Sequence, residues 1–285
     1  MDSTISNPIN NPIITDNTVR TNIVYFNNYC NLACTYCYET LDTVKKVTTS
    51  KEELKKIADD TIAREPKDKQ TFFELFGGEP SLSWDNVIYF MDYCYSIKQN
   101  IHFEMVTNGI RFIDDSFMFQ VYNSSHIKDG RLSISISYDG LEGNVDRIYQ
   151  DKRESTIDVV SVLSKLSVLG FPFRIRYTIH KKNLYHVVDD VSSILKYFKP
   201  ARIIISEVTE QLTDEDKHKV QRIYDLLKEK WNNNEITVPI CDVVCDTCNG
   251  CTIRRDNLHY FVGDKEFQKQ SYDEIAFNHF EREIK

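Results

Sequence analysis

Strand-like and helix-like runs alternate about six times between residues 22 and 206, and this alternation limits the fold more than any other feature. The strand-like runs are Asn22–Phe26, Thr71–Phe76, His102–Val106, Leu132–Ser137, Phe173–Ile179 and Ala201–Ile205. The helix-like runs between them are Ser50–Arg64, Trp84–Ile97, Ile113–Tyr122, Ser155–Leu169 and Tyr185–Phe198. Such alternation predicts βα units around a parallel sheet. The strands are apolar or mixed, which is typical of a sheet covered by helices.

The composition is that of a globular chain. The 285 residues include 35 Lys+Arg and 43 Asp+Glu, for a formal net charge of −8, and 41% of them are hydrophobic. These values exclude collagen-like and largely disordered chains. Nucleic-acid binding is not expected, because it requires a basic surface. No apolar run approaches the roughly 18 to 20 residues of a membrane span, and Met1–Thr18 lacks the features of a secretory signal, so we expect a cytoplasmic protein.

Seven of the eight cysteines fall into two tight clusters. The first cluster is Cys30, Cys34 and Cys37, the second is Cys241, Cys245, Cys248 and Cys251, and Cys94 stands alone. A disulfide framework scatters its cysteines through a small secreted chain, whereas cysteines two or three residues apart usually hold metal. We therefore predict metal or iron–sulfur ligation at both clusters and a packed core thiol at Cys94.

The first cluster directly follows the first predicted strand. Three thiolates in one loop can hold three corners of a cubane and leave the fourth iron without a protein ligand. An open metal position is typical of catalytic rather than structural sites. A Cys3His zinc site is the alternative, but the loop contains no histidine.

The C-x3-C-x2-C spacing of the first cluster resembles the radical S-adenosylmethionine (SAM) superfamily, and three further motifs match that family in order. They are Gly77-Gly78-Glu79-Pro80 after the second strand, Thr107-Asn108-Gly109 after the third and Ser137-Tyr138-Asp139-Gly140 after the fourth. The last motif resembles the S-x-D-G motif of the family's peptide- and protein-modifying branch. Active sites of α/β barrels lie at the carboxyl ends of the strands, where these motifs fall.

The resemblance implies a role for each motif. Cys30, Cys34 and Cys37 would hold a [4Fe-4S] cluster, and Gly77, Gly78, Glu79 and Pro80 would receive the SAM amino group. Tyr36 and Tyr38 would lie beside the adenine, Asn108 and Asp139 would belong to the cofactor site, and Ser137 would lie near the ribose. The branch usually continues with an Asp six residues beyond the last Gly, and Asp146 matches it here. For Asp139 and Asp146, shaping a turn is an equally weighted alternative to a ligand role. The family's arginine for the SAM carboxylate is Tyr149 here. Arg147, Arg153 or Arg176 could replace it, and we favour Arg176.

The resemblance implies a partial (βα)6 TIM-type barrel with a small C-terminal iron–sulfur cluster-binding extension. We expect a flexible tail over residues 1–18, the barrel over 19–208 and the extension over 209–285. The extension would comprise a bridging helix Thr213–Trp231, the second cysteine cluster, a strand Leu258–Val262 and a closing helix after Ser271. It looks like a short SPASM or twitch region. Its four cysteines would hold one auxiliary [4Fe-4S] cluster, with structural zinc as the less favoured alternative.

The implied activity is reductive cleavage of SAM to a 5′-deoxyadenosyl radical that abstracts a substrate hydrogen, with the protein supplying position and electrostatics. The branch favours a peptide or protein substrate and a low-potential electron donor such as flavodoxin or ferredoxin. A small-molecule or nucleotide substrate is the first alternative. A non-catalytic iron–sulfur sensor is the second, although a sensor needs no SAM pocket. No residue stands out as a protein acid or base.

Overall fold

The computed structural model describes residues 21–37, 46–208, 212–241, 258–262 and 265–269. The strands are β1 (Thr21–Tyr25), β2 (Thr71–Phe76), β3 (Ile101–Thr107), β4 (Leu132–Ser137), β5 (Phe173–Ile179), β6 (Arg202–Glu207), β7 (Ile240–Cys241), β8 (Leu258–Val262) and β9 (Lys265–Lys269). The α-helices are α1 (Lys51–Arg64), α2 (Trp84–Ile97), α3 (Asp115–Tyr122), α4 (Ser125–Lys128), α5 (Gly140–Gly143), α6 (Thr156–Val168), α7 (Val187–Tyr197) and α8 (Asp214–Asn232). Three 3-10 turns are η1 (Pro80–Ser83), η2 (Ile110–Ile113) and η3 (Asn144–Asp146).

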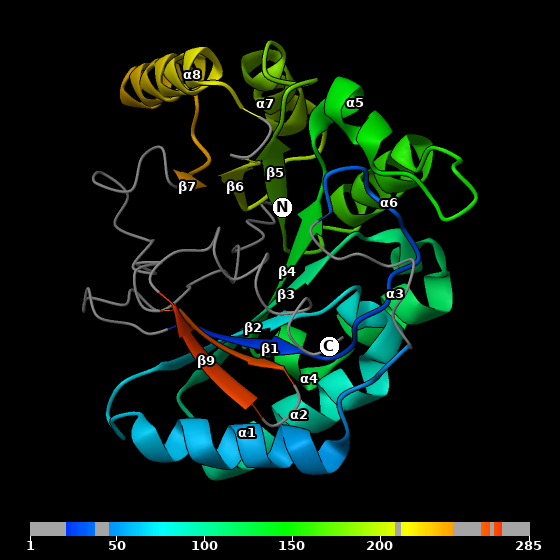
Figure 1. Cartoon of the computed structure of the whole chain (residues 1–285), viewed down its shortest axis with the longest axis vertical. Coiled ribbons are helices and arrows are strands. Elements are labelled where there is room, and N and C mark those ends of the chain that lie inside the picture. Colours follow the sequence, from blue (N-terminus) through cyan, green and yellow to red (C-terminus); the bar gives the residue numbers. More distant parts are fainter. Residues whose placement is uncertain (1–20, 38–45, 209–211, 242–257, 263–264, 270–285) are drawn as a thin grey trace, which may run out of the picture.

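The strands form one sheet in the order β7-β6-β5-β4-β3-β2-β1-β8-β9. Among the strands of the described residues, neighbours from β7 to β8 are parallel and the β8–β9 pair is antiparallel. The order of β1 to β6 follows the chain, with helices between successive strands, so the expected α/β barrel architecture is confirmed. The C-terminal residues join this sheet at both edges, with β7 beside β6 and β8 beside β1 (Figure 1).

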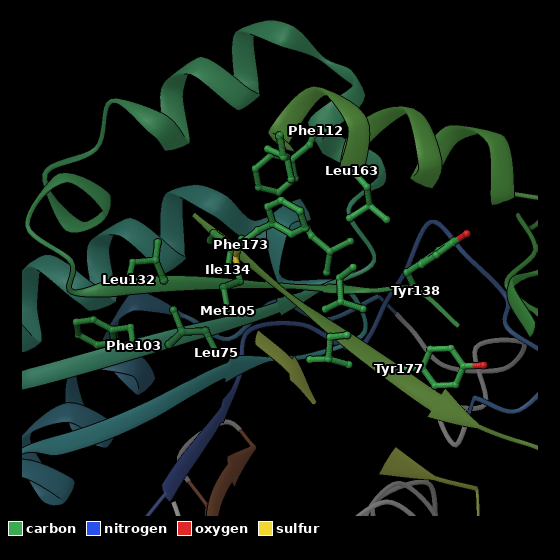
Figure 2. Close-up of a cluster of buried hydrophobic side chains, with 14 of the residues drawn as sticks. Leu75, Phe103, Met105, Phe112, Leu132, Ile134, Tyr138, Leu163, Phe173 and Tyr177 are labelled. Atoms are coloured by element: carbon green, nitrogen blue, oxygen red, sulfur yellow. The ribbon is translucent and has the colours of Figure 1, made fainter. Parts of the chain in front are cut away.

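Helices cover one face of the sheet and bury its apolar side chains. In Figure 1, α1 and α2 lie near β1 and β2, whereas α7 and α8 lie near β5 and β6. Figure 2 shows the core between them: Met105 and Ile134 project from the strands toward Phe112 and Leu163 of the helical segments, and all four are fully buried. This packing explains why every second residue of these strands is apolar. Within the described part of the chain, no helix is both long and apolar enough to cross a bilayer.

Most expected elements are present, and the differences lie at their ends. The predicted helix Ile113–Tyr122 is wrong in its first turn: η2 ends at Ile113, and α3 begins at Asp115 because Asp114 caps it by accepting from the Ser116 backbone N–H. The strands β7 and β9 were not predicted. Cys94 is fully buried, as expected. The predicted tail over residues 1–18 and the helix after Ser271 lie outside the described residues.

The opposite face of the sheet is polar and concave. Polar side chains on this face of β2 to β5 are Glu74, His102, Glu104, Ser133, Ser135, Ser137, Arg174 and Arg176. Arg176 on β5 forms an ion pair with Glu74 on β2, three strands away. Three strand spacings in a flat sheet would be about 14 Å. The contact therefore shows that the sheet curls around this face.

Buried charges hold the concave face together. The Arg174 Nη1 atom lies 2.8 Å from Glu104 Oε2, and the Ser135 hydroxyl donates to Glu104 Oε1 at 2.5 Å. Burial alone would raise the pKa of Glu104, but Arg174, Arg176 and the Ser135 hydrogen bond lower this pKa to about 2. Removing one partner of a buried ion pair typically costs several kcal/mol of stability. These buried ionised groups therefore hold the concave face in one arrangement.

The stability of the fold is expected to depend on His102 between pH 6.5 and 4. Burial, assisted by the nearby Arg174 charge, lowers the His102 pKa from 6.5 to about 4. As the pH falls, His102 is therefore protonated in the unfolded chain before it is protonated in the folded chain. The free energy of unfolding keeps its full value above pH 6.5 and decreases toward pH 4. The loss amounts to about 3 kcal/mol. Urea midpoints of the His102→Gln variant should fall less steeply over this range than those of the wild type, and parallel profiles would contradict the assignment.

Candidate active site

The loop after β1 carries three cysteine side chains at the carboxyl edge of the sheet. Cys30 and Cys34 are half-buried and Cys37 is exposed. The Cys30 sulfur accepts the Leu32 backbone N–H at 3.3 Å and the Asn108 side-chain amide at 3.4 Å. In the described part of the chain, no three Cys, His, Asp or Glu side chains converge on one metal-ion position. A cubane does not require such convergence, because each thiolate binds a different iron.

The glycines after β2 let this loop approach their backbone closely. A Cβ atom on Gly78 would lie 2.3 Å from the Tyr29 carbonyl oxygen, and one on Gly77 would lie 2.8 Å from the Asn27 carbonyl oxygen. The Gly78 N–H donates to Asn27 O, and the Glu79 N–H donates to Tyr29 O, both at 2.9 Å. Glycine is therefore required at both positions, because the backbone of the cysteine loop leaves no room for a Cβ atom.

Glu79 is buried and binds the motif that follows β3. Its carboxylate accepts the Thr107 hydroxyl at 2.6 Å, the Asn108 N–H at 2.7 Å and the Ser81 N–H at 3.0 Å. Burial raises the pKa of Glu79, and these hydrogen bonds oppose the rise. A carboxylate has about four acceptor positions, and the described donors use three. Glu79 can therefore accept one further donor, such as an ammonium group.

Asn108 links the β3 motif to the cysteine loop. Its side-chain amide donates to the Cys30 sulfur and, at 2.7 Å, to Asn31 Oδ1. Its own Oδ1 accepts the Ile110 N–H at 3.0 Å. The motifs after β1, β2 and β3 thus form one hydrogen-bonded unit through Glu79 and Asn108.

Asp139 is fully buried, and its carboxylate is saturated by protein donors. Arg147 donates from Nε at 2.7 Å and from Nη2 at 3.2 Å, and the Thr178 N–H donates at 2.8 Å. The Tyr36 hydroxyl also donates to it. The structure thus places Asp139 as an anchor for Tyr36 and Arg147, and its carboxylate has no acceptor position left for a ligand.

Ser137, Arg176 and Cys241 lie in one row across the concave face. Ser137 pairs in register with Arg176, Arg176 with Ile204, and Ile204 with Cys241. Register partners on parallel strands face the same side. Cys241 is the only member of the second cysteine cluster among the described residues. Cys245, Cys248 and Cys251, like Tyr38, lie outside them.

The remaining two arginine candidates, Arg176 and Arg153, each lie beside a protein carboxylate. Arg176 pairs with Glu74 and lies 3.6 Å from Glu104. Arg153 is exposed and lies 3.3 Å from Asp158, which also accepts the Tyr149 hydroxyl. Tyr149, at the position of the family's arginine, is therefore turned toward α6.

Two residues of the site were not predicted. The Asn27 amide donates to Glu79 O at 2.9 Å, while its Oδ1 accepts the Glu79 N–H at 3.2 Å. His180 stacks on Tyr36 with ring centroids 5.0 Å apart. Asn27 lies three residues before the first cysteine, so its place near the site could have been predicted from the sequence. His180 is distant from Tyr36 in the sequence and comes close to it only in the folded barrel.

Comparisons with known proteins agree with this geometry. The family model described as "Radical SAM superfamily" matches residues 24–193. A protein of Methanocaldococcus jannaschii named MJ0907, itself uncharacterised, is 29% identical over 179 residues, which cover 61% of this chain and 58% of that protein.

Two solved structures are similar in fold. The anSMEcpe structure with bound AdoMet and Kp18Cys peptide has a TM-score of 0.60 at 19% identity, covering 77% of this chain and 63% of that one. Streptococcus suis SuiB bound to the precursor peptide SuiA has a TM-score of 0.63 at 13% identity, covering 92% and 62%. The chain thus spans less than two thirds of the length of each of these proteins.

Proposed function

The chain belongs to the radical SAM superfamily and is a radical SAM enzyme, and from this premise we propose that it modifies a peptide or protein. The observation that supports SAM chemistry is the hydrogen-bonded unit in which Glu79 and Asn108 connect the loops after β1, β2 and β3. A closed structural metal site would not require the glycine and carboxylate motifs around it. The peptide substrate is supported separately, by the fold and by the fourth motif.

The first cysteine cluster fits a [4Fe-4S] cluster. Burial raises the pKa of Cys30, and the nearby Glu79 charge raises it further. An unaccompanied thiolate is therefore unfavourable there, whereas bound iron supplies the compensating positive charge. We propose Cys30, Cys34 and Cys37 as the ligands, with the Leu32 and Asn108 N–H groups stabilising the Cys30 thiolate. When bound, the cluster and SAM would supply hydrogen-atom abstraction from a substrate, through one-electron cleavage of SAM to methionine and a 5′-deoxyadenosyl radical.

The residues around the loop then bind and orient SAM. Glu79 accepts the SAM amino group at its remaining acceptor position, and the Gly77–Pro80 backbone lets the ligand approach. Tyr36, held by Asp139, would lie beside the adenine. The resemblance gives the same role to Tyr38, which lies outside the described residues. Ser137 and Arg176, which are register partners, serve the ribose and the carboxylate.

The peptide substrate is proposed from the fold and from the fourth motif. Both similar structures hold peptides, as their descriptions state. The Ser137-Tyr138-Asp139-Gly140 motif points in the same direction. A low-potential donor such as flavodoxin or ferredoxin would supply the electron.

The second cysteine cluster is proposed to hold an auxiliary [4Fe-4S] cluster. Cys241, Cys245, Cys248 and Cys251 supply four thiolates, enough for a closed site. Cys241 lies in the same row of the concave face as Ser137 and Arg176. This position supports an auxiliary cluster that faces the substrate.

Replacing Glu79 by Gln is expected to weaken SAM binding roughly tenfold to hundredfold, because a hydrogen bond to a charged group is worth about 1.5 to 3 kcal/mol. Calorimetric titration of the reconstituted protein measures this effect. Glu142→Gln, an exposed change on α5, is the matched control. Unchanged affinity in a Glu79→Gln protein with full iron content would exclude Glu79 from the site.

The substrate class is tested with short peptides encoded beside the gene. Each peptide is incubated anaerobically with the protein, SAM and dithionite, and its mass and its fragments are compared before and after. We expect a SAM-dependent mass change in one peptide, absent with the Cys30→Ala/Cys34→Ala/Cys37→Ala protein. SAM cleavage that is accelerated by a metabolite or nucleotide, and by none of the peptides, would contradict the peptide assignment.

A further inference from the structure

A buried ion pair lies directly against the cysteine loop. Backbone hydrogen bonds join the two segments: the Ala33 N–H donates to Ile148 O at 2.7 Å, and the Thr35 N–H donates to Asp146 O at 3.0 Å. These bonds flank Cys34 on one segment and Arg147 on the other. The fold therefore fixes Arg147 opposite Cys34, independently of side-chain rotamers.

The Arg147 side chain is held in a single orientation. Its guanidinium donates twice to Asp139, which is itself fully buried, and lies 5.4 Å from the centre of the Tyr36 ring. Arg147 is only 7% exposed. Burial raises the pKa of Cys34, and the nearby positive charge of Arg147 opposes that rise. The fold thus holds a buried cation next to the segment that carries one of the three candidate cluster ligands.

From this geometry we propose that Arg147 is a positioning residue that sets the reduction potential of the SAM-binding cluster through the Cys34 sulfur, with Asp139 limiting its effect. The inference rests on the proposed ligation by Cys30, Cys34 and Cys37. Hydrogen bonds to cluster sulfurs and local charge are established determinants of iron–sulfur potentials. Reduction adds one electron and hence one negative charge, which an adjacent buried cation stabilises.

The two halves of the pair should act in opposite directions. Arg147→Gln removes the cation and should shift the midpoint potential to more negative values. Asp139→Asn removes the opposing anion and should shift it to less negative values. Arg147→Lys keeps the charge and should give a smaller shift than Arg147→Gln. Lys182→Gln is the control, because it also removes one positive charge, from a side chain that is 62% exposed and screened by water.

The measurement is an anaerobic redox titration followed by electron paramagnetic resonance, without substrate. The signal that changes when SAM is added identifies the SAM-binding cluster. We expect opposite shifts in Arg147→Gln and Asp139→Asn and none in Lys182→Gln. Unchanged midpoints in variants with full iron content would overturn the inference. If the midpoint potentials are unchanged and Arg147→Gln binds SAM more weakly, Arg147 is a SAM ligand and the inference is also overturned.

Poor folding and failure of the proposed function give distinct results. If Arg147→Gln does not retain its cluster, the midpoint of Asp139→Asn decides alone. Loss of the cluster from both variants, but not from Lys182→Gln, would show a purely structural role and overturn the inference. A wild-type protein that binds no iron at this loop would instead refute the cluster assignment itself.

Discussion

The Gly78→Ala variant is expected to lose about 3 kcal/mol or more of its unfolding free energy, together with the geometry of the cysteine loop. The added Cβ would lie 2.3 Å from the Tyr29 carbonyl oxygen and 2.5 Å from its carbonyl carbon. These are backbone atoms, so the two segments must separate, and backbone rearrangement in a packed region carries large penalties. Chemical denaturation measures the loss, and the iron bound after reconstitution measures the effect on the site.

Gly130→Ala is the matched control for this change. Gly130 has a φ of +69°, but a Cβ there meets no atom within 4 Å. Its substitution should therefore cost only the left-handed backbone penalty of about 1 kcal/mol and leave iron binding intact. If both variants lost the same stability and bound the same iron, the close approach of Gly78 to Tyr29 would not matter for the fold or the site.

The Cys30→Ala/Cys34→Ala/Cys37→Ala variant is expected to lose about four irons per chain, because the three thiolates are the proposed protein ligands of one cubane. About four irons should remain at the second cysteine cluster. Iron and sulfide analysis after anaerobic reconstitution gives both numbers. The control is Cys94→Ala, since this thiol is buried in the core on α2 and does not belong to the loop.

Two results would contradict these assignments. Unchanged iron in the triple variant would show that the loop does not hold the cluster. Zinc without iron in the same variant would contradict an auxiliary iron–sulfur cluster and favour the structural zinc alternative.

The regular elements could be predicted because their signals are local. Thr71–Phe76, Leu132–Ser137 and Phe173–Ile179 have the predicted bounds as strands, since alternation and flanking turn residues mark their ends. The Ser50 capping box likewise marks the start of α1. In contrast, β7 has two residues and β9 is a polar run, so neither carries a periodic signal.

The site was predicted as a set of motifs, but the contacts between them depend on strand register. Nothing in the sequence indicates that the Glu79 carboxylate accepts the Asn108 N–H. Nor does it indicate that Arg147 and Tyr36 donate to the Asp139 carboxylate. The Glu79–Asn108 and Asp139–Tyr36 contacts join residues that are 29 and 103 positions apart. The charged layer of Glu74, Glu104, Arg174 and Arg176 was also missed, because alternating polar residues in a strand are typical of a solvated face, whereas here they line the inside of a curled sheet.

The most direct test of the account is whether the reconstituted wild-type protein cleaves SAM. Oxygen-free protein with full iron content is incubated with SAM and dithionite, and the products are separated by liquid chromatography. The account predicts 5′-deoxyadenosine and methionine in equal amounts, with none above background from the Cys30→Ala/Cys34→Ala/Cys37→Ala protein. Iron-replete protein that forms no 5′-deoxyadenosine, or whose cluster spectrum does not respond to SAM, would contradict the claim that this loop holds a cluster open to SAM.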